Sequence, residues 1–224
     1  MKSKTVISII LARKNSKGIK NKNLVKINKK PLIYWSIINS INSKLIEKTF
    51  VSSDSLKILN FSKKYGAEII KRPFKYAKKN TSSEKSLMHA INHLNGKIKF
   101  DTVIFIQPTS PLRKKDDFDN AIKLFKKKKF DSLFSATITH DTNIWHYAKK
   151  KLIANYNYKK RKMRQNIKEK YLENGSFYIF DKKKFENYNC RIFGKIGMYL
   201  MSKKNSFQID DYEDINLFRK LFTN

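Results

Sequence analysis

The sequence predicts an α/β fold in which a mostly parallel β-sheet is flanked by helices. Short apolar, β-branched segments alternate with longer amphipathic segments, a spacing typical of βαβ units. Hydrophobic residues make up 40% of the 224 residues and aromatic residues 13%, so the chain can bury a substantial core. We expect a single domain over residues 1–224.

The first predicted strand, residues 5–12, is an apolar, β-branched run of the kind that parallel sheets bury. Pro31, a residue favoured at the first position of a helix, opens a largely apolar helix that runs to about Asn42. Gly66 is placed to end the next helix in the left-handed conformation. The elements predicted around it are a strand over 48–53, a helix over 55–65 and a strand over 67–71.

Thr81 and Glu84 have the spacing of a capping box and predict the start of a helix that runs to about Asn95. Residues 116–128 carry their large apolar side chains at helical spacing and predict an amphipathic helix. The remaining predicted elements are strands over 102–106, 131–138, 176–180 and 196–201, and a C-terminal helix over 214–222.

The alternation stops at an insertion of about 140–172, which is polar, lysine-rich and aperiodic. It carries aromatic residues, among them Trp145, Tyr147, Tyr156 and Tyr158. Loops of this length are usually functional or disordered. Aromatic residues are enriched at protein interfaces, so the insertion predicts a homodimer contact.

A basic loop follows the first strand and contains a single glycine, Gly18. An α/β protein places phosphate groups in such loops, because glycine permits close backbone approach and the cations donate hydrogen bonds. The pattern is neither GxGxxG nor GxxxxGK[ST], so a solvated basic loop is the alternative. Arg13, Asp54, Arg72 and Gln107 each follow a predicted strand, which predicts a shared cleft at the carboxyl ends of the strands.

The formal net charge is +32, which is compatible with polyanionic substrates or with nucleic acid. The lysines are scattered in short runs along the chain, which favours a solvated surface over a nucleic-acid groove. Cys190 is the single cysteine, so no disulfide within the chain is possible. We find no signal peptide and no apolar run of the ~20 residues that a membrane span needs. We expect a cytoplasmic protein without nucleic-acid or membrane partners.

Several motifs together resemble one enzyme family, the CMP-sialic acid synthetases or acylneuraminate cytidylyltransferases. They follow in the family's order and span nearly the whole chain. These motifs are ARKNSKGIKNKNL (12–24), KPLIYWSI (30–37), VSSD (51–54), RP (72–73), TSS (81–83), QPTSPLR (107–113), ENGSFYIF (173–180) and IDDYED (209–214).

The resemblance implies a Rossmann-like fold of the nucleotide-diphospho-sugar transferase type. It also implies transfer of CMP from CTP to a sialic-acid-like 2-keto sugar acid, of N-acetylneuraminate or legionaminate type, with release of pyrophosphate. Such a reaction needs positioning and charge neutralisation more than covalent catalysis. A cytidylyltransferase for pseudaminic or 3-deoxy-octulosonic acid is one alternative. A basic nucleic-acid-binding protein is an alternative of another class.

The same resemblance implies roles for individual residues. Arg13, Ser16, Lys17 and Gly18 would hold the triphosphate, with Lys22 near the α-phosphate; Asn23, Arg72, Thr81 and Ser83 would read the cytosine. Gln107, Thr109, Ser110, Tyr178 and, from the insertion, Arg164 and Gln165 would contact the acidic nine-carbon sugar. Helix capping by Thr81 and Ser83 is compatible with base reading, and a core position is the alternative for Tyr178.

Asp210 would hold a Mg²⁺ ion and share catalysis with Arg13 and Lys22. The family usually has Asp where this chain has Lys79 and Gln208. Gln is a neutral oxygen ligand, so a hydrated Mg²⁺ on Asp210 and the substrate phosphates remains reasonable. Asp211, Glu213 and Asp214 could instead form an acidic helix start, which is favourable to the helix dipole.

Overall fold

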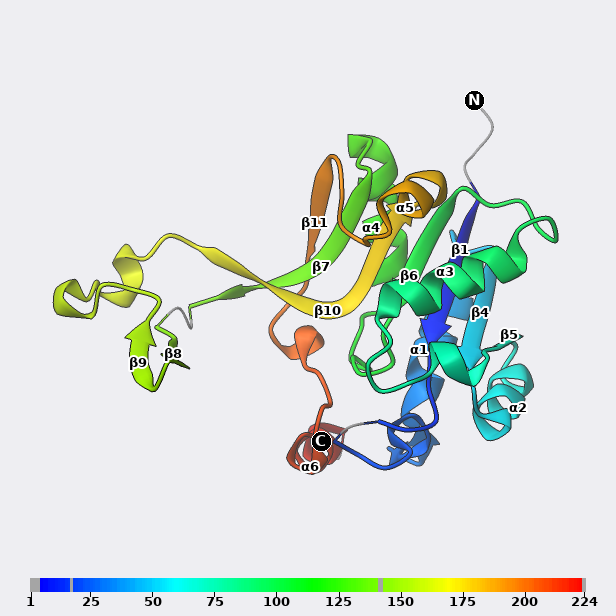
Figure 1. The fold of residues 1–224 in the computed structure, drawn as a ribbon, viewed down its shortest axis with the longest axis horizontal. Coiled ribbons are helices and arrows are strands. Elements are labelled where there is room, and N and C mark those ends of the chain that lie inside the picture. Colours follow the sequence, from blue (N-terminus) through cyan, green and yellow to red (C-terminus); the bar gives the residue numbers. More distant parts are fainter. Residues whose placement is uncertain (1–4, 17, 141–142, 223–224) are drawn as a thin grey trace.

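The computed structural model describes residues 5–16, 18–140 and 143–222, and it confirms the predicted α/β architecture. A seven-stranded sheet has the order β11-β7-β10-β6-β1-β4-β5 (Figure 1). Its strands are β1 (Val6–Leu11), β4 (Lys48–Ser53), β5 (Glu68–Lys71), β6 (Thr102–Ile106), β7 (Ser132–Thr139), β10 (Lys170–Asp181) and β11 (Ile196–Leu200).

Neighbouring strands pair in parallel except where β10 lies antiparallel between β6 and β7. The central strand β1 pairs with β4 on one side and with β6 on the other. The carboxyl ends of β1, β4, β5 and β6 therefore meet at one edge of the sheet. The loops that follow these strands lie where an open parallel sheet binds its ligands.

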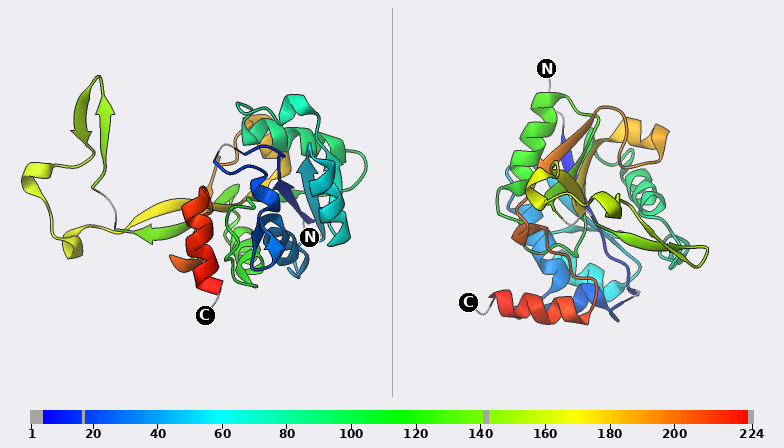
Figure 2. Two further views of the ribbon diagram at one scale, coloured as in Figure 1. Left: turned by 90° about the horizontal axis from the view of Figure 1, so that it is seen from below. Right: turned by 90° about the vertical axis from the view of Figure 1, so that its left-hand side faces the viewer.

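Helices cover both faces of the sheet (Figure 2). Alternate residues of β6 point to opposite faces: Ile104 and Ile106 pack with α1, α2 and α4, whereas Val103 and Phe105 pack with α3 and α5. A third cluster lies between α6 and the small hairpin β2–β3. The helices are α1 (Leu32–Ile41), α2 (Leu56–Lys64), α3 (Ser83–Leu94), α4 (Asp117–Lys128), α5 (Lys182–Tyr188) and α6 (Tyr212–Phe222); the hairpin is β2 (Lys26–Ile27) with β3 (Lys30–Pro31).

None of the helices in the described part of the chain combines the length and apolar character that a membrane crossing requires.

Some local predictions are wrong in detail. Ser82, and not Thr81, caps α3, because its hydroxyl accepts a hydrogen bond from the Lys85 backbone N–H at 3.3 Å. The Thr81 hydroxyl donates to the backbone carbonyl of Lys75 instead. Helix α1 begins at Leu32, since Pro31 belongs to the short strand β3. The sequence analysis also missed α5 and the hairpin β2–β3.

The insertion is more ordered than its aperiodic sequence predicts. Strands β7 and β10 continue their antiparallel pairing into it, to Thr139 and Lys170, and it carries a hairpin of β8 (Trp145–Ala148) and β9 (Lys151–Ala154). Lys149 and Lys150 both adopt positive φ angles in the hairpin turn, where Asn-Gly is the usual signal. Figures 1 and 2 show that this insertion projects from the sheet as an arm, which we define as its described residues 139–140 and 143–171.

We predict that Phe177→Ala destabilises the fold by about 3–5 kcal/mol, the usual cost of removing a buried Phe side chain. Phe177 is fully buried and lies edge-on to Phe118, with 5.3 Å between the ring centroids. Urea unfolding measures the change. Leu56→Ala is the control, because Leu56 is 64% exposed and should cost little. Equal effects of the two substitutions would contradict the packing described here.

Candidate active site

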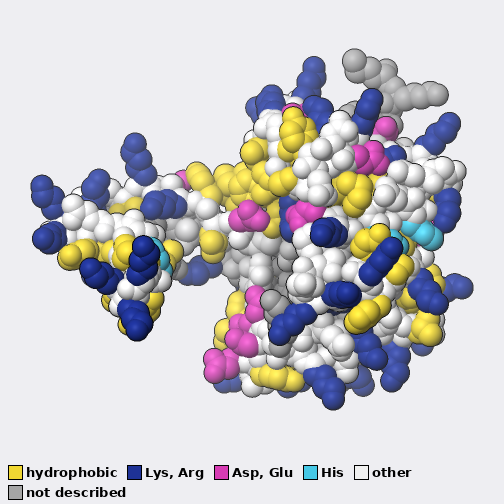
Figure 3. Space-filling view, viewed as in Figure 1, with side chains coloured by type: hydrophobic (Ala, Val, Ile, Leu, Met, Phe, Trp, Pro, Cys, Tyr) yellow, Lys and Arg dark blue, Asp and Glu magenta, His cyan; other side chains and the backbone are white. Residues whose placement is uncertain are grey.

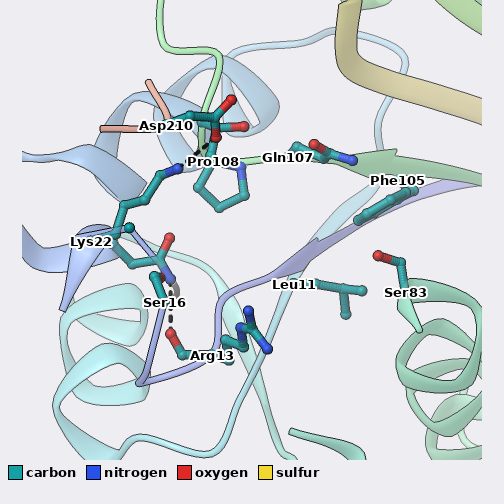
Figure 4. A pocket seen from close by; sticks show the side chains of 12 residues that line it. Leu11, Arg13, Ser16, Lys22, Ser83, Phe105, Gln107, Pro108 and Asp210 are labelled. Carbon is teal, nitrogen blue, oxygen red and sulfur yellow. Dashed lines mark hydrogen bonds and ion pairs between the residues drawn. The ribbon is translucent and has the colours of Figure 1, made fainter. Parts of the chain in front are cut away.

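A cleft of about 440 Å³ opens at the carboxyl edge of the sheet (Figure 4). Its walls come from the loop after β1, the end of β6 with its following loop, the start of α3, and the segment before α6. The structure thus brings together residues that are far apart in the sequence. The sequence-predicted residues that line the cleft are Arg13, Ser16, Gly18, Lys22, Asn23, Ser83, Gln107, Thr109 and Asp210.

A second cavity, of about 340 Å³, adjoins the first. Arg13 and Ser83 belong to the walls of both, so the two cavities meet around these side chains. Arg72 and Thr81 line the second cavity together with Tyr76. Of the residues that the sequence assigned to the base, Arg72, Thr81 and Ser83 therefore line the second cavity, whereas Asn23 lines the first cleft.

An ion pair at one end of the cleft joins the segment after β1 to the segment before α6. The Lys22 Nζ lies 2.8 Å from Oδ1 of Asp210, and Figure 4 shows the contact. The Lys22 side chain is 10% exposed and that of Asp210 is 69% exposed. A Cβ on Gly18 would lie 2.6 Å from the carbonyl oxygen of Asp210, so this position requires glycine. Loop and C-terminal segment are thus in direct backbone contact.

The other acidic residues near Asp210 are used to begin α6. Oδ1 of Asp211 accepts the backbone N–H of Asp214 at 2.9 Å. Oδ2 of Asp214 accepts the N–H groups of Asp210 at 2.7 Å and Asp211 at 3.1 Å. This is the reciprocal pattern of a capping box, and it confirms the acidic helix start for Asp211 and Asp214. The carboxylate of Asp210 remains available to the cleft.

The carboxylate of Asp210 fits a hard cation such as Mg²⁺ whose remaining ligands come from a bound substrate and from water. In the described ranges, no three His, Cys, Asp or Glu side chains gather to form a metal site. Mg²⁺ is commonly held by one or two carboxylates, with phosphate oxygens and water completing its shell. The mostly exposed Asp210 carboxylate can supply the protein's share of such a shell.

Gln208 holds the segment before Asp210 against the sheet. Its Nε2 donates to the backbone carbonyl of Asn174, in the bulge where the β10 register shifts. Gly175 next to it has φ +61°, and a Cβ there would lie 2.7 Å from that same Nε2. The amide of Gln208 is therefore committed to β10 in this structure.

Arg113 fixes the loop after β6. Its Nε donates to the Ser176 hydroxyl at 2.7 Å and one terminal nitrogen to the Ser36 hydroxyl at 3.0 Å. The other terminal nitrogen donates to the backbone carbonyls of Ser176 and Gln107. Burial lowers the pKa of this guanidinium to about 9, opposed by the charge of Asp117. Arg113 thus sets the position from which Gln107 enters the cleft.

Arg72 is buried in a different way. Its side chain follows β5, and its Nε and one terminal nitrogen have no hydrogen-bond partner among the described residues. Burial lowers the pKa of the Arg72 guanidinium to about 10. The charge of Asp54 raises this pKa, and the charge of Arg13 lowers it. Buried unsatisfied donors are rare and costly, so these point to a ligand that accepts hydrogen bonds in the second cavity.

Other predicted residues lie outside these cavities. Tyr178 is buried behind the cleft wall, with its ring stacked on Phe105 at 5.8 Å and its hydroxyl donating to Glu173. Burial and Glu173 raise the pKa of that hydroxyl. Ser110 is buried, and its hydroxyl has no partner in the described structure. Arg164 and Gln165 lie on the arm, away from the cleft of their own chain, and Lys17 lies outside the described residues.

The sequence analysis did not single out Phe105 and Leu11, which line the cleft, or Arg191, which lies against Phe105. Leu11 and Phe105 are apolar strand residues, and the apolar runs that contain them predict only that they are buried in the core. Arg191 stands alone in a loop and belongs to no recognisable motif.

Comparisons with known proteins point to one family. Residues 7–222 match the sequence profile of the cytidylyltransferase family. The chain is 32% identical to a CMP-N,N'-diacetyllegionaminic acid synthase of Campylobacter jejuni, over 97% of this chain and 95% of the relative. It is 29% identical to an N-acylneuraminate cytidylyltransferase of Escherichia coli, over 95% of this chain and 51% of that longer protein. A solved CMP:2-keto-3-deoxy-manno-octonic acid synthetase, complexed with CTP, shares the fold with a TM-score of 0.74 at 13% identity, covering 98% of each chain.

We predict that Arg72→Met stabilises the unliganded protein by about 1–3 kcal/mol, because it removes buried donors that lack partners. Arg113→Met is the matched control and should destabilise by about 3–5 kcal/mol, since it breaks a satisfied buried network. Urea unfolding of both variants gives the comparison. A loss of stability in Arg72→Met as large as that in Arg113→Met would mean that Arg72 is satisfied within the fold.

Proposed function

Because the chain belongs to the cytidylyltransferase family, it is a nucleotidyltransferase, and we propose that it activates an acidic nine-carbon 2-keto sugar. It transfers CMP from CTP to an acid of the N-acetylneuraminate or legionaminate type and releases pyrophosphate. One observation carries the proposal. Arg13, Lys22 and Asp210 line one cleft, and the adjoining cavity is lined by Arg72, two of whose side-chain nitrogens have no hydrogen-bond partner among the described residues. Relatives named for N-acylneuraminate and diacetyllegionaminic acid support the sugar class.

In this proposal CTP spans the two cavities. Arg13, Ser16, Gly18 and Lys22 hold the triphosphate in the larger cleft. The cytosine enters the second cavity, where its carbonyl oxygen accepts from Arg72. Thr81 and Ser83 line the same cavity, and Asn23 would reach the base from the adjoining cleft. Arg13 borders both spaces and so lies between base and phosphates.

The reaction is a substitution at the α-phosphorus. The anomeric oxygen of the sugar forms a new P–O bond while the bond to pyrophosphate breaks, and the hydroxyl proton is released. Arg13 and Lys22 neutralise charge on the transferring and leaving oxygens, which are strong electrostatic effects in a preorganised cleft. A bound Mg²⁺, held by Asp210 and the phosphates, would supply further neutralisation.

The sugar acid occupies the Gln107 side of the cleft. Gln107 and Thr109 line this side, and Arg113 fixes the loop that carries them. Ser110 and Tyr178, which the resemblance also assigns to the sugar, are both buried. The two anionic substrates enter a strongly cationic molecule, whose Lys and Arg side chains are spread over the face seen in Figure 3. We place the reaction in the cytoplasm, where CTP is available.

The arm forms a homodimer contact in this proposal. It exposes large apolar side chains, among them Tyr147 at 78%, Met163 at 62% and Tyr158 at 57%. Figure 3 shows hydrophobic and basic side chains together on the arm. Exposed apolar patches of this kind mark interaction sites. A second copy docked here would let Arg164 and Gln165 approach the cleft of their neighbour.

A pyrophosphate-release assay tests the function. The purified protein receives CTP or UTP with N-acetylneuraminic, legionaminic, pseudaminic or octulosonic acid. We expect release with CTP and one or more of the nine-carbon acids. We expect little with UTP, because uracil presents a carbonyl oxygen and an N–H where cytosine presents its amino group and a bare ring nitrogen, so groups that pair with this edge of cytosine would be mismatched. No release with any pair, together with a salt-sensitive gel shift on nucleic acid, would overturn the proposal.

We predict that Arg13→Ala or Lys22→Ala lowers kcat/KM by roughly 10²-fold, the effect of removing one preorganised charged group.

Asp210→Asn should nearly abolish turnover and change the dependence of rate on Mg²⁺ concentration. Asp211→Ala is the neighbouring control: it removes the cap of α6, costs about 1 kcal/mol of stability and leaves the Mg²⁺ response unchanged. An active Asp210→Asn enzyme with the wild-type Mg²⁺ response would remove the metal assignment.

We predict a dimer at micromolar concentration in sedimentation velocity. Trp145→Ala with Tyr147→Ala should raise the dissociation constant at least about 10-fold, because exposed aromatic residues are common interface hot spots. Tyr188→Ala, an exposed aromatic of α5 away from the arm, serves as the control. A monomeric wild-type protein would count against the arm as the contact.

A further inference from the structure

The peptide unit between Arg13 and Lys14 is held by a side chain at each of its two ends. Its carbonyl oxygen, on Arg13, accepts a hydrogen bond from Nδ2 of Asn23 at 3.0 Å. Its N–H, on Lys14, donates to Oδ1 of Asp54 at 2.7 Å. Asn23 belongs to a short 3₁₀ turn further along the same loop, whereas Asp54 directly follows β4. The backbone from which Arg13 enters the cleft is therefore fixed from two sides.

The bond to Asp54 continues the pairing of β1 with β4 beyond the end of the strands. The Ala12 N–H donates to the backbone carbonyl of Ser52 at 3.0 Å. Two residues further along each strand, a regular parallel ladder would join the Lys14 N–H to the backbone carbonyl of Asp54. The carboxylate of Asp54 accepts this N–H instead. Because its acceptor is ionised, this hydrogen bond is stronger than the backbone bond that it replaces.

Asp54 lies behind the loop after β1 and outside the cleft. The half-buried residue borders a separate space of about 620 Å³, together with Lys14 and Asn21. Among the described residues, those that line the cleft and the second cavity do not include Asp54. Arg13, by contrast, lines both of these cavities, and Figure 4 shows its side chain in the cleft. Asp54 is thus placed to act on a bound nucleotide through the loop and not by contact.

Two other roles for Asp54 can be separated from this one. Asp54 does not cap α2, because the hydroxyl of Ser55 accepts the Ile58 N–H at 3.5 Å. Its charge does act on Arg72: burial lowers the pKa of that guanidinium, and the charge of Asp54 opposes the shift. Charge and hydrogen bond can be removed one at a time, because Asn keeps the acceptor oxygen in place and Glu keeps the charge.

We propose that Asp54 is a positioning residue for CMP transfer: through the Lys14 N–H it holds the backbone that aims the Arg13 guanidinium at the triphosphate. The inference rests on the proposed function, in which Arg13 neutralises charge on CTP. The tip of the Arg13 side chain is held by one longer hydrogen bond, from a terminal nitrogen to the Lys78 carbonyl at 3.3 Å. A shift of the backbone would break that bond as well. A misplacement of about 1 Å can lower a catalytic rate by 10²-fold.

A double-mutant cycle tests the proposal. Pyrophosphate release at saturating N-acetylneuraminic or legionaminic acid gives kcat/KM for CTP with wild type, Asp54→Ala, Arg13→Ala and the double variant. Asp54→Asn keeps an acceptor oxygen in place and removes the charge, whereas Asp54→Glu keeps the charge and displaces the oxygen by one methylene. Asp101→Ala is the matched control, because Oδ2 of Asp101 accepts the Thr5 backbone N–H at 3.2 Å, at the amino end of β1.

We expect Asp54→Ala to lower kcat/KM for CTP by about 10- to 100-fold and to leave the KM for the acid unchanged. In the Arg13→Ala protein the same substitution should cost no more than about 2-fold, because the group through which it acts is gone. Asp54→Asn should retain most of the activity, and Asp54→Glu should lose it as Asp54→Ala does. Asp101→Ala should lose a similar amount of stability in urea and keep the wild-type kcat/KM.

The outcomes separate the two proposals. An Asp54→Ala enzyme with the wild-type kcat/KM, or one whose loss is equally large in the Arg13→Ala protein, overturns the role of Asp54 alone. A loss in Asp54→Asn as large as that in Asp54→Ala assigns the effect to charge and overturns it too. If Asp54→Ala does not fold, Asp54→Glu takes its place in the cycle, with the same criteria. A wild type that binds no CTP in isothermal titration and releases no pyrophosphate overturns the proposed function and this inference with it.

Discussion

The parallel pairing of β1 between β4 and β6 is the constraint on which the rest of the molecule depends. It sends the carboxyl ends of three buried strands to one edge, so that loops distant in sequence line one cleft. Apolar side chains on both faces of β1, Val6 and Ile10 on one and Ile7 and Ile9 on the other, let the helical layers on both sides of the sheet pack against this strand. The candidate functional groups lie on the loops that these strands position.

The C-terminal segment closes the cleft through contacts that depend on one another. Gln208 bonds the β10 bulge, Ile209 bonds the Thr109 carbonyl at 2.8 Å, and Asp210 pairs with Lys22. Arg113 holds the bulge and the loop after β6 from the opposite side. These contacts connect the loop after β1, the loop after β6, the β10 bulge and the segment before α6. The cleft is thus built from several loops, each of which is held in place by one or a few contacts.

Much of this could be predicted from the sequence. The apolar run of β1 predicted the first strand, and the motifs predicted the family. The glycine at position 18 was expected to let the loop approach a phosphate, and its backbone contact with Asp210 was not predicted. Contacts between distant residues could not be predicted. Nothing in the sequence tells that Gln208 donates to Asn174, that Arg191 lies on Phe105, or that two lysines turn the arm hairpin. These follow from tertiary packing, which overrides local propensity.

The central claim is that the cleft joins CMP to a sugar acid and does not merely hydrolyse CTP. Phosphorus-31 NMR of the protein with CTP, Mg²⁺ and N-acetylneuraminic or legionaminic acid distinguishes these directly. The account predicts that a phosphodiester resonance of the CMP-sugar and the resonance of pyrophosphate grow together in equal amounts. Free CMP or CDP without the phosphodiester, or no loss of CTP with either acid, would contradict it.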